Sequence, residues 1–387
     1  MTLSPGGAVI SGIGMSPIGR RTGIAGIDLT AAAADKALSD AGLAPSDIDG
    51  ITTMGDTPIR EASARLGIDA TWQGGGFDTG GLLSPVMSAC LAVSTGRARH
   101  VLVYRTVQMM GGTILPEPGS ERPGPSPGAG RAIPGMDWIG PLLTMHAYSA
   151  ANWLAMHCRR HMHLYGTTKE QLGWLAVNSR RNAALNPDAA YREPLTLDDY
   201  LEARPISEPF GLYDCDVPVD GSIALVVSGS AYAGDSKNRS IRVEAYGGSP
   251  GLGAWDQRPD YPNMAATDAA ADMWSRTDLG PNDVDVAELY DGFTFLSLAW
   301  LEALGLCGPG ESGPFIEGGS RIALDGELPL NTYGGQLSAG RMHGYWVLHE
   351  AVHQLRHQAG ERQVAGAEVA AVSVGGGPIA GCMLLIR

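Results

Sequence analysis

Ala269-Ala-Ala-Asp-Met-Trp-Ser-Arg-Thr-Asp-Leu-Gly-Pro-Asn-Asp-Val-Asp-Val286 repeats a pattern that first occurs, one residue longer, at Ala32-Ala-Ala-Asp-Lys-Ala-Leu-Ser-Asp-Ala-Gly-Leu-Ala-Pro-Ser-Asp-Ile-Asp-Gly50. Both runs pass from Ala-Ala-Ala-Asp through a helical pattern to Pro-x-Asp, an aliphatic residue and Asp. A long internal duplication predicts topology. We therefore expect two similar α/β halves, residues 1–235 and 236–387, which join near residues 230–240.

Elements around the first copy support the α/β class. Ala8-Val-Ile-Ser-Gly-Ile-Gly and His100-Val-Leu-Val-Tyr-Arg are typical of buried strands, and the glycine-rich residues 73–81 are predicted to open a helix that reaches Val93. Strands that alternate with helices favour a parallel sheet with helices on its faces. Residues 107–205 interrupt this order, so we expect them to form an excursion of loop and helices inserted in the first half.

The excursion begins with residues 111–141, whose many Gly and Pro residues predict a long loop. A helix is expected from Tyr148 to Tyr165, and Thr167 or Thr168 should cap the next one. His161 and His163 lie near the end of the first helix, but no carboxylate follows them at helical spacing. A solvated helix end is therefore favoured over a metal site.

Composition excludes several classes of protein. The 387 residues are 44% hydrophobic and 18% charged, which suits a large globular core. The net charge of −14 argues against a nucleic-acid partner, because phosphates need clustered Lys and Arg. Without an apolar run of about 18 residues or a basic leader, we expect no membrane span and no secretory signal. The five scattered cysteines favour neither a disulfide framework nor a zinc site, so a cytoplasmic location is the expectation.

Leu330-Asn-Thr-Tyr-Gly-Gly-Gln-Leu-Ser-Ala-Gly-Arg-Met-His-Gly-Tyr345 gathers groups that can do chemistry around a glycine turn. Tyr333, Arg341 and His343 flank glycines that admit a ligand or another backbone, and a helix is expected to follow from Gly344. A tight turn ahead of a packed helix is the structural alternative. Tyr290-Asp-Gly-Phe-Thr, about forty residues upstream, shifts the interpretation towards an active site.

The two halves, Val219-Asp-Gly-Ser, Asn331-Thr-Tyr-Gly-Gly and the closing Ser373-Val-Gly-Gly-Gly together resemble the thiolase superfamily, in its lipid-transfer or sterol-carrier branch. The resemblance covers essentially the whole chain. It implies the five-layered α/β/α/β/α thiolase fold, an obligate homodimer and an acyl-CoA thioester substrate. Coenzyme A would then enter as part of the substrate, and no other cofactor is expected.

The catalytic residues of thiolases are not present at the matching positions. Phe77 stands where the family has its nucleophilic cysteine, Arg341 where it has a histidine and Ser373 where it has a second cysteine. Because Claisen chemistry needs a thiolate, acyl transfer by that route is not expected. Cys90 lies well inside a predicted core helix, so a packed thiol is favoured there over a substitute nucleophile.

A smaller branch, the steroid side-chain-cleaving aldolases, lacks the same residues, uses tyrosines and works with a small DUF35 partner of OB-fold and zinc-ribbon type. Tyr290 matches one of its tyrosines. The second would fall at Arg341, where this chain departs, and Tyr333 is the candidate to replace it in space. The resemblance implies a substrate site that includes the following residues: Phe77, Asp291, Gly335, Ser338, Ser373 and Gly376.

A retro-aldol cleavage of a β-hydroxyacyl-CoA needs a base, enolate stabilisation and an acid. We expect Arg341 to lower the pKa of Tyr290 or Tyr333 so that the phenolate acts as the base. His343 would be the acid or enolate donor, and backbone N–H groups of Gly335 and Gly376 would bind the thioester oxygen. A buried tyrosine with a satisfied hydroxyl and a structural ion pair are the alternative interpretations for Tyr290 and Arg341.

The sequence leaves three functions open. The first is a carbon–carbon lyase that cleaves a bulky, steroid-like β-hydroxyacyl-CoA into a ketone and a short acyl-CoA. The second is an acyl-CoA acyltransferase of degenerate thiolase type. The third is a non-catalytic thiolase-fold subunit that binds lipid or CoA. Release of a ketone would identify the first, and dependence on free CoA would identify the second.

Overall fold

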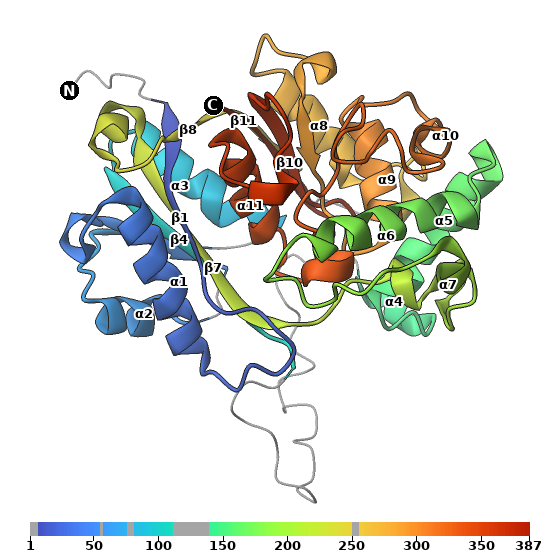
Figure 1. Ribbon diagram of the computed structural model, residues 1–387, viewed down its shortest axis with the longest axis horizontal. Coiled ribbons are helices and arrows are strands. Elements are labelled where there is room, and N and C mark those ends of the chain that lie inside the picture. Colours follow the sequence, from blue (N-terminus) through green and yellow to red (C-terminus); the bar gives the residue numbers. More distant parts are fainter. Residues whose placement is uncertain (1–6, 55–56, 76–80, 111–138, 250–254) are drawn as a thin grey trace, which may run out of the picture.

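The structure is a computed structural model that describes residues 7–54, 57–75, 81–110, 139–249 and 255–387 (Figure 1). Its strands form a nine-stranded sheet and a separate pair, β5 with β6. The strands are β1 (Ala8–Met15), β2 (Gly50–Thr53), β3 (Trp72–Gly75), β4 (His100–Gln108), β5 (Pro205–Ser207), β6 (Phe210–Gly211), β7 (Asp220–Gly229), β8 (Ile241–Gly248), β9 (Val286–Glu288), β10 (Val369–Gly375) and β11 (Ala380–Ile386). The α-helices are α1 (Gly26–Ala41), α2 (Ile59–Leu66), α3 (Ser84–Ser94), α4 (Ile139–Thr144), α5 (Ala150–Tyr165), α6 (Lys169–Ala184), α7 (Leu197–Leu201), α8 (Ala265–Trp274), α9 (Thr294–Ala303), α10 (Ser312–Ile316) and α11 (Tyr345–Leu355).

The large sheet is mixed, with the strand order β3-β2-β4-β7-β1-β8-β11-β10-β9. The outer pairs β2–β3, β2–β4 and β9–β10 are parallel, as predicted. The pairs around β1, β7, β8 and β11 are antiparallel, so the prediction of a parallel sheet is wrong for the centre. Only residues 376–379 connect β10 to β11, which is too short for the crossover that a parallel pair needs.

Helices cover both faces of the N-terminal strands. Along β4, Val101 and Val103 belong to the hydrophobic core that contains α3, whereas Leu102 and Tyr104 belong to the core under α1 and α2. Successive side chains of a strand point to opposite faces, so the two sets of helices lie on opposite sides of the sheet. Burial on both faces explains why these strands are apolar without alternation.

The duplicated segments form the same structure in each half. α1 leads through a 3₁₀ turn at Pro45–Asp47 to β2, and α8 leads through a 3₁₀ turn at Pro281–Asp283 to β9. Each alanine-rich helix also packs closely on a glycine of a central strand. A Cβ on Gly14 would lie 2.2 Å from the carbonyl oxygen of Ala33, and one on Gly247 would lie 2.1 Å from that of Ala269. The small alanine side chains of these helices and the glycines of the strands therefore allow each helix to pack closely on the sheet.

The two halves of the sheet meet where β1 pairs with β8 through Ala8 to Ile10. α11 contacts β9 and β10 of the C-terminal half and also β1 and β7 of the N-terminal half, so it lies in a layer between them (Figure 1). α8 packs on β8 and β11. Layers of helices thus alternate with the strands of each half.

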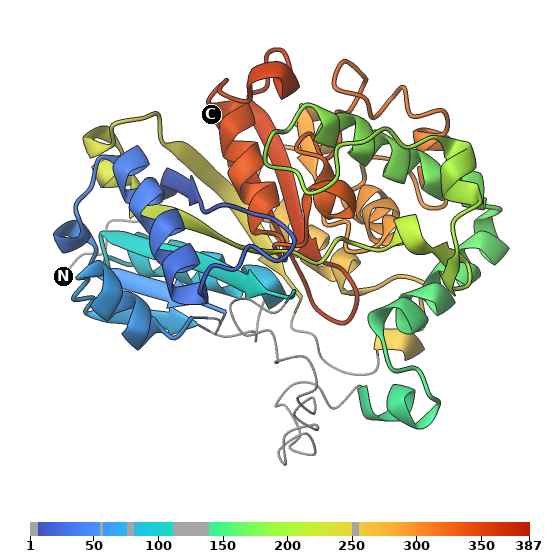
Figure 2. The ribbon, with the colours of Figure 1, turned by 60° about the horizontal axis from the view of Figure 1, so that its bottom comes forward.

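The excursion packs on the C-terminal half, where α6 contacts α9 and α10 (Figure 2). Its predicted helix from Tyr148 is confirmed as α5, and the predicted cap is confirmed because the Thr168 hydroxyl accepts a hydrogen bond from the Gln171 N–H. His161 bonds through its two ring nitrogens to Glu302 and Thr167, which gives it a structural role. The predicted loop at 111–141 lies mostly outside the described residues.

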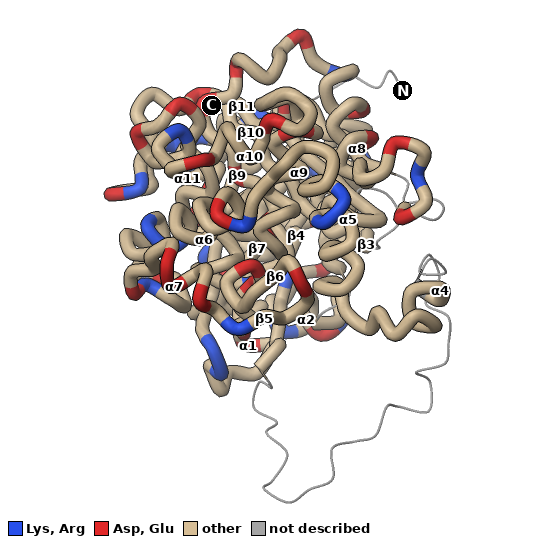
Figure 3. The backbone as a smooth tube through the Cα atoms, turned by 90° about the vertical axis from the view of Figure 1, so that its right-hand side faces the viewer, with Lys and Arg blue, Asp and Glu red and all other residues tan. Residues whose placement is uncertain are grey.

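Residues 73–75, predicted to open a helix, instead belong to β3 at the end of the sheet. In the view of Figure 3, Lys and Arg positions are dispersed among Asp and Glu positions. None of the helices in the part of the chain that the structure describes is long and apolar enough to cross a membrane.

Candidate active site

A cavity of about 360 Å³ brings together residues from both ends of the chain. Most of its wall is apolar, and four groups in it can exchange protons or carry charge: Asp216, Tyr290, Arg341 and His343. The rest of the described lining is Leu82, Ala150, Trp153, Leu154, Trp255, Gly292, Phe293, Leu296, Gly375, Gly377, Pro378 and Ile379. An apolar cavity with a few convergent polar groups is typical of a site for a small, largely hydrophobic ligand.

Tyr290 follows β9 and lines this cavity. Its N–H donates to the Ser373 hydroxyl at 3.1 Å, which ties the segment to β10. A Cβ on Gly292 would lie 2.7 Å from the Tyr290 ring. Any larger residue at position 292 would therefore clash with the ring in its present position. Burial, and next the Asp216 carboxylate, raise the pKa of Tyr290. The expectation of a lowered pKa is therefore wrong in net direction, because burial outweighs the opposing effect of Arg341, and the phenol carries its proton at neutral pH.

His343 lines the cavity, and its contacts define which ring nitrogen carries the proton. Its Nδ1 contacts a guanidinium nitrogen of Arg105 on β4. Since a guanidinium can only donate, Nδ1 accepts and the ring proton is on Nε2. Burial, Arg105 and Arg341 hold the pKa of His343 well below its usual range. Its Nε2–H has no hydrogen-bond partner among the described residues and can donate to a ligand.

Arg341 and Asp216 form an ion pair, with Nη1 3.2 Å from the carboxylate. The Arg341 N–H bonds to the Val217 carbonyl oxygen, which fixes the turn against the segment that enters β7. Burial raises the pKa of Asp216 to about 7, although Arg341 opposes the shift. Sequence reasoning missed Asp216, although Asp-Cys-Asp-Val-Pro-Val-Asp places three carboxylates just before or at the start of a buried strand.

Asp291 shapes the site from behind the cavity wall. Its carboxylate accepts hydrogen bonds from the N–H groups of Gln336 at 2.8 Å and Leu337 at 3.4 Å, at the start of the π-helical turn Gly335–Ala339. Gly335 has a φ of 61°, and a Cβ there would lie 1.9 Å from the same carboxylate. Asp291 and Gly335 therefore position the chain that leads to Arg341, and neither belongs to the described lining.

Comparisons with known proteins agree with this architecture. Residues 253–386 match the family model described as Thiolase C-terminal domain-like. The chain is 36% identical to 17-hydroxy-3-oxo-4-pregnene-20-carboxyl-CoA lyase of Mycobacterium tuberculosis, over 98% of this chain and 99% of that protein. It is 35% identical to the steroid side-chain-cleaving aldolase of Thermomonospora curvata, over 92% of each. The chain belongs to the thiolase superfamily, in the branch of the steroid side-chain-cleaving aldolases.

A solved structure of this branch, the Ltp2-ChsH2(DUF35) aldolase, superposes with a TM-score of 0.87 at 31% identity and covers 100% of this chain and 99% of that one. A thiolase-like protein of sterol-carrier type from Mycobacterium smegmatis, at 16% identity and a TM-score of 0.71, shares the fold. The predicted family and the α/β thiolase fold are confirmed.

Other residues that the thiolase resemblance placed in the site have supporting positions. The Ser338 hydroxyl accepts from Arg180 Nε at 2.9 Å, and the Ser373 hydroxyl is occupied by the Tyr290 N–H. The Gly376 N–H donates to the Ile379 carbonyl oxygen within the β10–β11 turn. The expectation that this group binds a thioester oxygen is therefore wrong, because its proton is already used. Phe77 lies outside the described residues.

Tyr333 does not line the catalytic cavity. It is fully buried and stacks on Trp346 with ring centroids 5.3 Å apart, and its hydroxyl has no hydrogen-bond partner among the described residues. Burial and nearby carboxylates raise its pKa well above its usual range. The structure thus brings three predicted catalytic residues together and leaves Tyr333 outside.

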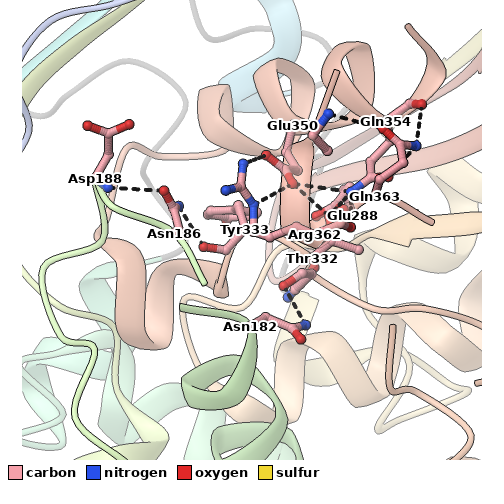
Figure 4. Close-up of polar contacts among 12 residues, drawn as sticks. Asn182, Asn186, Asp188, Glu288, Thr332, Tyr333, Glu350, Gln354, Arg362 and Gln363 are labelled. Carbon is pink, nitrogen blue, oxygen red and sulfur yellow. Dashed lines mark hydrogen bonds and ion pairs between the residues drawn. The ribbon is translucent and has the colours of Figure 1, made fainter. Parts of the chain in front are cut away.

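A buried polar network next to Tyr333 holds the turn in place (Figure 4). The Thr332 hydroxyl lies 2.6 Å from Glu288 and 3.0 Å from Glu350, and Arg362 pairs with Glu350 at 2.9 Å. Burial and the Glu350 carboxylate raise the pKa of Glu288 well above its usual range. These bonds anchor residues 331–334 to β9 and α11, which explains the polar residues in an otherwise apolar core.

The described cysteines have environments that oppose thiolate chemistry. Cys90 is fully buried in α3, where burial raises its pKa to about 12. Cys215, half-buried next to Asp216, also has its pKa raised to about 12, first by burial. None of the described residues that line the cavity is a cysteine. A nucleophilic thiol of thiolase type is therefore absent from the described part of this site.

Proposed function

We propose that this chain catalyses retro-aldol cleavage of a bulky, steroid-like β-hydroxyacyl-CoA into a ketone and a short acyl-CoA. The observation that carries the proposal is the cavity itself: its wall is apolar, its described lining lacks a thiol, and Asp216, Tyr290, Arg341 and His343 converge on it. Acyl transfer through an enzyme thioester would need a thiolate, whereas retro-aldol cleavage needs only proton transfer and stabilisation of an enolate.

The named relatives support the substrate class. In 17-hydroxy-3-oxo-4-pregnene-20-carboxyl-CoA, the substrate in the name of the M. tuberculosis relative, the hydroxyl on C17 is β to the thioester carbonyl. This arrangement allows the C17–C20 bond to break with formation of a ketone and a thioester enolate. The aromatic and aliphatic wall formed by Trp153, Trp255, Phe293 and Leu296 suits a large apolar carbon skeleton.

The protonation states define roles for two groups. His343 Nε2–H can donate to the thioester oxygen, where negative charge develops as the carbon–carbon bond breaks. Tyr290 carries its proton and can deliver it to the α-carbon of the enolate. Tyr290 is thereby an acid, whereas the sequence predicted a base, and His343 has one of its two predicted roles, that of donor to the enolate.

The assembly that we propose is a homodimer with a DUF35 partner, and coenzyme A enters only as part of the substrate. β3 ends the sheet, so its outer edge has no strand partner among the described residues and is open to a second copy. The partner follows from the name of the Ltp2-ChsH2(DUF35) aldolase, which matches this chain over its whole length. Light scattering at micromolar concentration should give at least a dimer, and a monomer mass would contradict the assembly.

Comparison of 17-hydroxy-3-oxo-4-pregnene-20-carboxyl-CoA with its 17-deoxy analogue tests the reaction type. A retro-aldol enzyme requires the hydroxyl and should leave the analogue intact, whereas a thioester acyltransferase given an acyl acceptor would use both. The assay uses the purified chain alone and its complex with any DUF35 protein that co-purifies. Equal consumption of both thioesters would overturn the proposal.

A further inference from the structure

Asp216 is a lining residue of two cavities. It lines the cavity described above and also a second one of about 380 Å³. The other residues lining the second cavity are Arg20, Arg180, Tyr191, Leu212, Tyr213, Cys215, Val217, Pro218 and Leu337. The Asp216 N–H donates to the Gly292 carbonyl oxygen at 3.2 Å, which holds the residue next to the segment that carries Tyr290. Asp216 is thus a buried acidic residue in the wall of the cavity that contains Tyr290, Arg341 and His343.

We infer that Asp216, rather than a tyrosine, is the general base that takes the β-hydroxyl proton, an assignment that rests on the proposed retro-aldol function. Its ion-pair partner Arg341 holds the carboxylate in the cavity wall at 3.2 Å and leaves acceptor capacity on the oxygens. No other acidic side chain belongs to the described lining of the catalytic cavity.

The other three polar groups of the cavity cannot accept this proton at neutral pH. Tyr290 is protonated because burial and Asp216 raise its pKa. His343 uses Nδ1 to accept from Arg105 and carries its proton on Nε2, so it too can only donate. Arg341 has no acceptor atom. Among the described residues that line the cavity, Asp216 is therefore the one side chain with an oxygen that can accept this proton.

The surroundings of Asp216 bring its pKa close to neutral pH, which is the range that suits a general base. Burial raises its pKa to about 7, Arg341 lowers it and Asp291 raises it. A base with a pKa near the working pH is ionised often enough to act and still holds a proton well. Tyr290, Arg341 and His343 line the catalytic cavity with it. The titratable or charged residues that line the second cavity with it are Arg20, Arg180, Tyr191, Tyr213 and Cys215.

The proposed step balances without an added reactant. The hydroxyl proton passes to the Asp216 carboxylate, and the electron pair of that O–H bond becomes the π bond of the ketone. The electrons of the broken carbon–carbon bond form the thioester enolate, which His343 Nε2–H stabilises. The enolate carbon takes the Tyr290 proton, and the phenolate regains a proton from Asp216, directly or through solvent. The β-carbon is formally oxidised to a ketone and the α-carbon is reduced by the same two electrons, so no external oxidant or reductant is needed. Both side chains return to their starting states.

The test measures pH profiles of kcat and kcat/KM for cleavage of 17-hydroxy-3-oxo-4-pregnene-20-carboxyl-CoA. Wild-type activity should rise about tenfold per pH unit below a midpoint near 7 and level off above it, because only the ionised carboxylate is active. Asp216→Asn should lose roughly 10²–10⁴-fold in kcat and lose this limb of the profile. Arg341→Met should move the midpoint to higher pH, because Arg341 lowers the pKa of Asp216.

Two further variants separate chemistry from structure. Asp216→Ala should regain roughly tenfold in rate when acetate or formate is added, because a small carboxylate can take the vacated place. The surface variant Asp260→Asn, which lies in an exposed ion pair with Arg258, should match wild type. If wild type releases no ketone, the proposed function fails. If wild type cleaves and Asp216→Asn keeps its turnover and its pH limb, only the base assignment is overturned.

Discussion

Removal of the Tyr290 hydroxyl tests the proton donor with little disturbance of the fold. Tyr290→Phe deletes one oxygen, whereas the ring stays held by Gly292 and the backbone by the Ser373 hydroxyl. If the phenol delivers the proton to the enolate, kcat should fall by roughly 10²–10⁴, the usual contribution of a positioned acid or base. At about 1.4 kcal/mol per decade, this loss equals about 3–5 kcal/mol of transition-state stabilisation.

The assay is turnover of the C17-hydroxy thioester, with KM and the melting temperature measured for the same protein. KM should change far less than kcat, because the apolar wall that binds the skeleton is intact. Tyr246→Phe is a matched control, since Tyr246 lies half-buried on β8 and outside the lining of the cavity. If Tyr290→Phe keeps more than about half of wild-type kcat, the phenol is a packing group and the reasoning about its proton is refuted.

Three other changes follow from burial and contacts. Cys90→Ser, and treatment of wild type with iodoacetamide at pH 7, should leave most turnover intact because burial raises the Cys90 pKa to about 12; activity lost in step with alkylation of one thiol would restore an acyl-enzyme. Gly335→Ala puts a Cβ 1.9 Å from the Asp291 carboxylate and should lower the free energy of unfolding by at least about 2 kcal/mol. The control Gly67→Ala has a similar φ of 71° but no atom within 4 Å of the new Cβ, so it should lower the free energy of unfolding by only about 1–2 kcal/mol. Arg362→Met leaves the buried Glu350 without its cation and should cost about 3–5 kcal/mol in urea unfolding; a change below 1 kcal/mol would show that the network is not needed.

The duplication made the fold predictable. The Ala-rich runs near 32 and 269 each led to a helix, a 3₁₀ turn and a strand, and both helices pack on strand glycines. β3 was missed because Trp72–Gly75 is a short, glycine-rich edge strand with no alternation of apolar residues. The central antiparallel pairs were missed because strand direction depends on how long connections return to the sheet, which a local pattern does not contain.

The site was predictable only in part. Tyr290, Arg341 and His343 were found from glycine turns rich in polar side chains, and they do line one cavity. Asp216 and Arg105 were missed because they meet Arg341 and His343 across more than a hundred residues of chain. The predicted direction of the tyrosine pKa shift was wrong because burial raises the pKa of Tyr290 and Tyr333, and only the folded structure shows that burial.

The most direct test of the central claim is the product balance of a single reaction run without free CoA. The purified chain, as it co-purifies, is given 17-hydroxy-3-oxo-4-pregnene-20-carboxyl-CoA in D₂O, and the products are identified by mass spectrometry. The retro-aldol account predicts equal amounts of a ketone and a short acyl-CoA, with one deuterium added at the α-carbon of the acyl group. Turnover that needs added CoA, or an acyl-CoA without a matching ketone, would contradict it.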